Sequence, residues 1–123
     1  MRRIFCLMTV LLLIMPIESF ARGFIKGFED VPLMDGLKQE SNHNFSFGNE
    51  ESGYTETLLS AKTKNLKFSR VKFFYKDVLP KLGWSLAKES NAGLKFSREE
   101  DILEISQRGC KPLKVLIMLK SEN

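Results

Sequence analysis

Histidine and cysteine are scarce in this chain, which limits the chemistry that it can perform. The 123 residues include one histidine, His43, and two cysteines, Cys6 and Cys110. A serine or cysteine nucleophile needs a base beside it, usually histidine, and a structural zinc site needs about four nitrogen or sulfur ligands. His43 lies in the polar stretch 41–44, where we expect a solvated side chain. The sequence therefore argues against a catalytic triad and a zinc site, and we predict no cofactor.

The chain also lacks a glycine-rich phosphate loop and any internal repeat. Gly48 and Gly53 flank acidic residues, which would repel a phosphate group. With 8 glycines, 4 prolines and 43% hydrophobic residues, the composition fits neither a collagen-like repeat nor wholesale disorder. A chain of this length has room for one small domain with a single core.

The first residues have the pattern of a secretory signal peptide. Arg2 and Arg3 precede an apolar run over residues 4–17, and Ser19 and Ala21 provide the small side chains of a cleavage site. This run is shorter than the roughly 20 apolar residues that span a bilayer. We expect cleavage after Ala21 and delivery to the periplasm or the cell exterior, with a retained signal anchor as the alternative.

Export would change the charge and the redox chemistry of the domain. Removal of Arg2, Arg3 and Glu18 lowers the formal net charge from +4 to +3, a modest charge for a nucleic-acid partner, which we do not expect. Cys6 would leave with the signal peptide, so that Cys110 could form no internal disulfide. A lone exported thiol can be reactive or intermolecular, but we expect a partly buried, inert side chain near a strand.

Beyond the signal peptide, we divide the chain into an N-terminal arm, residues 22–42, and a domain, residues 43–123. The arm contains glycine and proline together with apolar side chains that a flexible linker would lack. We therefore expect its second half to pack against the domain or to await a partner. Early in the domain, the alternating residues 45–47 and 54–62 predict two strands joined as a hairpin.

Four more strands are expected in the second half of the domain. A turn at 91–93 separates two alternating segments, which predicts another hairpin. Residues 102–105 and 113–120 follow as two further strands. The last of these has apolar side chains on both faces, which is typical of a central strand or of one covered on each side.

One amphipathic helix is predicted between the two hairpins. Ser69 is placed as its N-cap, Pro80 should tighten its last turn, and Gly83 suits the left-handed residue after its end. Its apolar stripe, at helical spacing, consists of Val71, Phe74, Tyr75, Val78, Leu79 and Leu82.

Together these elements predict an α+β fold in which an antiparallel sheet carries a single helix packed on one face, as a two-layer sandwich. One helix cannot cover six strands. The arm, curvature of the sheet or another molecule must shield the remainder.

The segment from Phe73 to Trp84 has an aromatic pair, then Leu79-Pro80, then Leu82-Gly83-Trp84. In this pattern, and more loosely in residues 28–37 and 94–99, the chain resembles a family of small exported bacterial proteins of unknown role. The resemblance implies an exported α+β domain with a helix-to-strand corner at this segment. It implies no reaction and no functional residue.

A basic stretch is the most prominent candidate surface. Residues 62–81 contain seven lysines and arginines against one acid, Asp77, and Phe73 falls on the outward side of the helix. Such a surface suits an anionic membrane face, an envelope polymer or an acidic protein. Alternatively, the arm covers Phe73 and the lysines only solvate the helix. The residues assigned to a partner or membrane surface are Arg70, Lys72, Phe73 and Lys76.

These observations favour a non-catalytic, exported binding domain that contacts an envelope protein or polymer through the basic helix surface or an open sheet face. One alternative is a small envelope-acting hydrolase whose carboxylates would come from residues 99–101 and Glu104. Another is a peripheral membrane protein that uses Phe73. We assign no catalytic residue.

Overall fold

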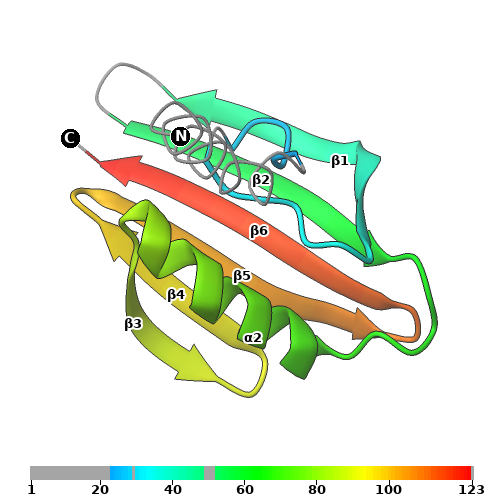
Figure 1. Ribbon diagram of the computed structural model, residues 1–123. Helices are drawn as coiled ribbons and strands as arrows, with labels where there is room; N and C mark the ends of the chain where they lie inside the picture. The colour runs from blue at the N-terminus through cyan, green and yellow to red at the C-terminus, as the bar shows by residue number, and fades with distance from the viewer. Residues whose placement is uncertain (1–22, 29, 49–51, 123) are drawn as a thin grey trace, which may run out of the picture.

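The computed structural model describes residues 23–28, 30–48 and 52–122, which form a six-stranded antiparallel sheet with one α-helix (Figure 1). The predicted α+β fold is confirmed. The expected signal peptide and Cys6 lie outside the described residues. The helix α2 (Phe68–Val78) leads into a 3-10 turn, η2 (Leu79–Leu82). The strands are β1 (Leu37–Gly48), β2 (Ser52–Ala61), β3 (Ser85–Ser90), β4 (Gly93–Arg98), β5 (Asp101–Cys110) and β6 (Leu113–Glu122).

The last strand of the chain is central, as its apolar character predicts. The strand order is β1-β2-β6-β5-β4-β3, so β6 pairs with β2 on one side and with β5 on the other. Val115 and Ile117 are fully buried on one face of β6, and Leu116 is 5% exposed on the opposite face. The first hairpin and the later meander are thereby joined into one sheet through β6.

The helix begins two residues before the predicted start. Lys67 is the N-cap, with extended backbone and no side-chain capping hydrogen bond, so the expectation that Ser69 caps the helix is wrong. Phe68 is the first residue of the helix, and its side chain is buried in the core, whereas Ser69 is exposed. The predicted end is confirmed: Pro80 lies in η2, and Gly83 follows with a left-handed φ of 95°.

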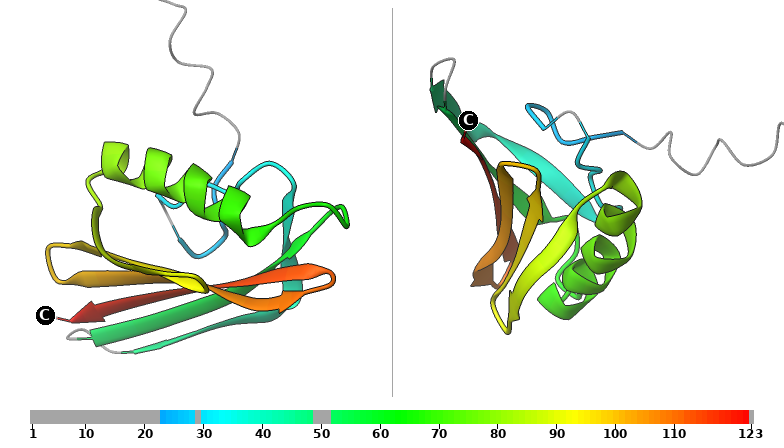
Figure 2. Two further views of the ribbon diagram at one scale, coloured as in Figure 1. Left: turned by 90° about the horizontal axis from the view of Figure 1, so that it is seen from below. Right: turned by 90° about the vertical axis from the view of Figure 1, so that its left-hand side faces the viewer.

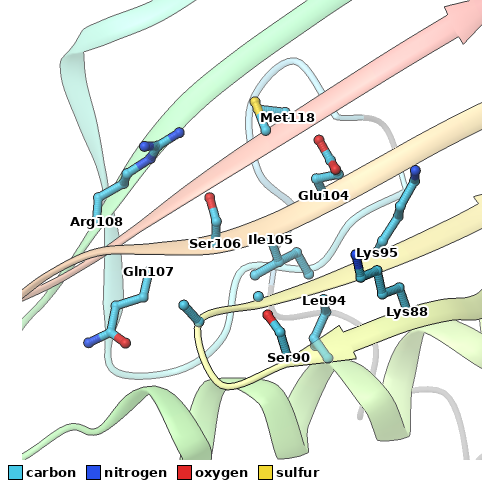
Figure 3. A pocket seen from close by; sticks show the side chains of 12 residues that line it. Lys88, Ser90, Leu94, Lys95, Glu104, Ile105, Ser106, Gln107, Arg108 and Met118 are labelled. Atoms are coloured by element: carbon cyan, nitrogen blue, oxygen red, sulfur yellow. The ribbon is translucent and has the colours of Figure 1, made fainter.

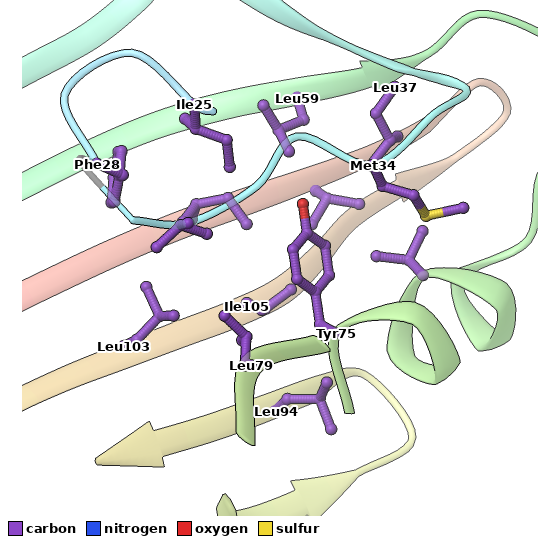
Figure 4. Packing of buried hydrophobic residues seen from close by; sticks show 14 of the residues in the cluster. Ile25, Phe28, Met34, Leu37, Leu59, Tyr75, Leu79, Leu94, Leu103 and Ile105 are labelled. Carbon is purple, nitrogen blue, oxygen red and sulfur yellow. The ribbon is translucent and has the colours of Figure 1, made fainter. Parts of the chain in front are cut away.

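The arm and the helix cover the same face of the sheet (Figure 2). The apolar side chains of the arm lie beside Tyr75 of α2 and against core residues of the sheet such as Leu59 and Leu103 (Figure 4). This packing explains how one helix suffices for six strands. The buried arm residues are Ile25, Phe28, Val31 and Met34.

Two polar contacts fix the arm in this position. The Tyr75 hydroxyl donates a hydrogen bond to the Pro32 carbonyl oxygen over 2.8 Å, and burial raises the pKa of Tyr75 above its usual range. The Arg98 guanidinium forms an ion pair with Asp30, donates to the Leu82 carbonyl oxygen over 3.1 Å and lies 4.2 Å from the centre of the Trp84 ring. Arg98 thus connects the arm, the end of η2 and strand β4.

Strand β1 begins at Leu37, eight residues before the alternation that predicts it. Its register with β2 is irregular between Gln39 and Asn44, which hides the period of two in the sequence. The Gln39 side chain also accepts from the Lys26 backbone N–H over 2.9 Å and donates to the Lys26 carbonyl oxygen over 3.0 Å. Residues 37–42 of the predicted arm therefore form the beginning of β1, and Gln39 bonds this segment to the first part of the arm.

Because the arm is part of the core, shortening one of its buried side chains should destabilise the whole domain. Phe28 is 1% exposed, and we expect Phe28→Ala to lower the free energy of unfolding by about 3–5 kcal/mol in urea titrations. The matched control is Phe24→Ala, because Phe24 is 44% exposed in the same arm; its cost should stay below about 1 kcal/mol. Equal small losses for both variants would show that the arm is not part of the core.

Candidate functional site: the open face of the sheet

The face of the sheet opposite the helix and the arm is uncovered by any described element (Figure 2). Directly opposed residues in antiparallel strands share a face, so strand register identifies the side chains on this side. One row runs across five strands. Its members are Lys95, Glu104, Met118, Glu56 and Phe45. We call this side the open face.

A cluster of three aromatic rings lies at the β1–β2 end of the open face. Phe45 and Phe47 stack at a centroid distance of 6.1 Å, and Tyr54 lies 5.7 Å from Phe45 and 5.3 Å from Phe47. Phe45 is 47% exposed and Phe47 is 65% exposed. Large apolar side chains exposed together on a protein surface often mark a contact site.

The Glu56 carboxylate connects this aromatic cluster to His43. Tyr54 donates a hydrogen bond to Glu56 Oε1 over 2.6 Å, and His43 Nε2 lies 2.9 Å from Glu56 Oε2. The hydrogen bonds from Tyr54 and then from His43 lower the pKa of Glu56, and the bond to Glu56 raises the pKa of Tyr54 to about 12. His43 is exposed, as the sequence predicts, and its partner is this carboxylate rather than a nucleophile.

The other end of the open face has a shallow hollow of about 410 Å³ that three basic side chains line, with Lys88 and Lys95 at one side and Arg108 at the other (Figure 3). Figure 3 shows Glu104, Ser106 and Met118 pointing away from α2. Around these residues, Lys88, Lys95 and Arg108 line the hollow from β3, β4 and β5.

The cations of this hollow share it with one acid, Glu104, which lies opposite Lys95 in the register of β4 and β5. Among the described residues, Lys88, Lys95 and Arg108 form no ion pair. The buried Ser106 Oγ also has no hydrogen-bond partner in this part of the chain. A buried hydroxyl usually has a partner, but this oxygen is covered by neighbouring atoms, so the hollow attracts an incoming anion through its positive charge.

The sequence-predicted helix surface has the expected geometry but less free charge. Phe73 is 74% exposed, so the described arm does not cover it, and Arg70 is exposed nearby on α2. Lys76 Nζ lies 3.0 Å from Glu89 Oε1, and Lys72 Nζ lies 3.3 Å from Glu89 Oε2. The hydrogen bonds from Lys76 and Lys72 lower the pKa of Glu89. One acid of β3 therefore partly neutralises two of the four predicted residues.

Two other expectations from sequence have mixed outcomes. Cys110 is exposed at the end of β5, beside the turn to β6, so the expected partial burial of its thiol is wrong. Glu99 and Glu100 form an exposed turn, as expected. The described residues contain no group of three or more side chains arranged to hold a metal ion.

The sequence did not point to the two ends of the open face. The Phe45-Ser46-Phe47 alternation predicts a strand, but not that both rings face solvent. Lys88, Lys95 and Arg108 are dispersed along the chain, and only the β3–β4–β5 pairing brings them together. With the correct strand order and register, the aromatic residues and the three basic residues could have been assigned to the same face of the sheet.

Comparison of the chain with protein-family models, with curated proteins and with solved structures gave no match. No helix in the described part of the chain is long and apolar enough to cross a membrane. The functional argument therefore comes from the geometry of the open face.

The Tyr54–Glu56 contact predicts an unusual tyrosine titration. In the native protein the tyrosinate absorbance of Tyr54 should develop near pH 12, and Glu56→Ala should return this transition towards about 10, the ordinary value. A raised pKa stabilises the fold below the unfolded-state value, so the contribution of Tyr54 to stability is lost as the pH rises from about 10 to about 12.

Spectrophotometric titration with Tyr54→Phe as the control assigns the transition, because Tyr75 is the other tyrosine. A transition of Tyr54 near the ordinary value in the unmodified protein would show that the contact with Glu56 does not form in solution.

Proposed function

We propose that this protein is an exported, non-catalytic domain that binds an anionic polymer of the cell envelope on the open face of its sheet. The observation that carries the proposal is the hollow lined by Lys88, Lys95 and Arg108, which form no ion pair with a described residue and outnumber its one acid, Glu104. Its place in the envelope follows from the signal-peptide pattern of residues 1–21.

Charge and shape would provide the binding energy. The hollow is shallow, and the open face continues beyond it over Met118 towards Lys120 of β6, which pairs with Ile102 of β5. A ligand with repeated negative charges can therefore contact several cations at once, which a small anion cannot. Attraction between the cations of the open face and an anionic polymer also accelerates their association, and added salt weakens this attraction.

The open face suits this role better than the helix surface. Glu89 lies within ion-pair distance of both Lys72 and Lys76, so that an anionic ligand would have to compete with it there. At the hollow, the one acid is Glu104, and it forms no ion pair with a described residue.

Charge reversal at the hollow tests the proposal. We expect the double variant Lys95→Glu/Arg108→Glu to bind polygalacturonate, used as an anionic polysaccharide probe, at least about tenfold more weakly, which corresponds to about 1.4 kcal/mol. Affinity should be measured by calorimetry at low and high salt, with circular dichroism as the check on folding. The salt dependence should also decrease, because fewer cations take part.

The matched control is Lys64→Glu/Arg70→Glu, which makes the same change in net charge at two exposed residues outside the hollow, one before α2 and one on it. This control should retain binding. Equal losses in both double variants would contradict a specific site on the open face. Flotation with anionic vesicles that is lost in Phe73→Ser, together with no polysaccharide binding, would instead assign the contact to the helix surface.

A further inference from the structure

We propose that the β1 edge of the sheet pairs with the β1 edge of a second copy of the chain, so that the two sheets join antiparallel into one. This inference is independent of the polymer proposed above. Strand β1 is the first strand in the sheet order, and in the described part of the chain it pairs with β2 alone. Residues 41–48 along this edge are all exposed.

The end of β1 lacks the features that protect sheet edges. Natural edge strands are usually short, interrupted, charged or covered, because their unpaired backbone groups otherwise pair with another chain. Residues 44–48 contain no charged residue and no proline. They pair regularly with β2 beyond the irregularity that ends at Asn44. The backbone of this segment is therefore a continuous template for another strand.

The opposite edge of the same sheet shows the contrast. Strand β3 has six residues, and its register is irregular between Leu86 and Lys88. It carries charges at Lys88 and Glu89, and Glu89 is held by two lysines of α2. These are the protective features that residues 44–48 lack. The two edges of one sheet thus differ, and only the end of β1 is suited to pairing.

The aromatic side chains indicate what pairs there. Phe45 and Phe47 are two residues apart, point to the open face and stack against each other and Tyr54. An added strand with apolar side chains at the same spacing would cover them, and cross-strand aromatic pairs stabilise the pairing of two strands. A second β1 strand supplies this pattern, because its own Phe45 and Phe47 would lie beside the first pair.

The distribution of charge favours a second copy at this edge. Without the signal peptide the protein carries a formal net charge of +3, so two copies repel each other over most orientations. Pairing of two uncharged segments brings no like charges into contact. In such a pair, a two-fold axis perpendicular to the sheet relates the two copies. The interface is therefore self-complementary, and the open faces of both copies lie on the same side of the joined sheet.

Only a short segment of β1 pairs in this dimer. The surface area buried in the interface should therefore be smaller than that of stable complexes, which bury about 1,200–2,000 Å². We therefore expect a reversible dimer that depends on concentration.

Analytical ultracentrifugation tests this inference. It uses the protein purified after export, at micromolar to millimolar concentration, with a reductant that keeps Cys110 reduced. We expect a monomer–dimer equilibrium, and we expect Phe47→Lys to weaken dimerisation at least about tenfold, because it places two like charges at the joint. The matched control is Phe73→Lys, which introduces the same residue at a phenylalanine that is 74% exposed on the helix. It should dimerise as the unmodified protein does.

A monomer at every concentration of the unmodified protein would overturn the proposal, and so would equal weakening by both lysine variants. If Phe47→Lys fails to fold, Phe45→Lys takes its place. Amide hydrogen exchange of the unmodified protein gives a second measurement, in which protection of residues 44–48 should rise with concentration. Unchanged protection would also contradict the pairing.

Discussion

The structure depends on the packing of the arm beside the helix on one face of the sheet. A single helix leaves part of a six-stranded sheet uncovered, and the buried side chains of the arm, such as Phe28 and Val31, fill that space. Tyr75 and Arg98 then fix the arm through its backbone and through Asp30. Because the arm and the helix both pack on one face of the sheet, the side chains on the opposite face are not required for the core.

That freedom gives the open face its mixed chemistry. Its middle is apolar, with Leu116 and Met118 on β6, and its two ends differ: stacked aromatic rings at β1 and β2, and a basic hollow at β3 to β5. Neither the three aromatic rings nor the three basic side chains belong to the core cluster. The two ends suit different partners, an uncharged strand at the β1 edge and an anionic chain at the hollow.

Local sequence patterns predicted most of the fold. The Val71–Leu82 stripe, Pro80 and Gly83 determined the helix and its end, because these signals act over a few residues. The start of β1 was missed because its irregular register with β2 hides the alternation. The Ser69 cap was wrong because burial of Phe68 outweighed capping preference. Phe73 was correctly placed outward, but its neighbours Lys72 and Lys76 are held by Glu89, an acid distant in sequence.

The central claim is that ligand binds the face of the sheet opposite the arm and the helix. Methyl NMR during titration with polygalacturonate tests it most directly, because neighbouring residues of one strand report opposite faces. The account predicts shifts for Met118 and Ile102, which lie on the open face, and little change for Val115 and Ile117, which are fully buried on the other face and do not line the hollow. Shifts confined to Val71 and Val78 of α2, with Met118 unchanged, would contradict it.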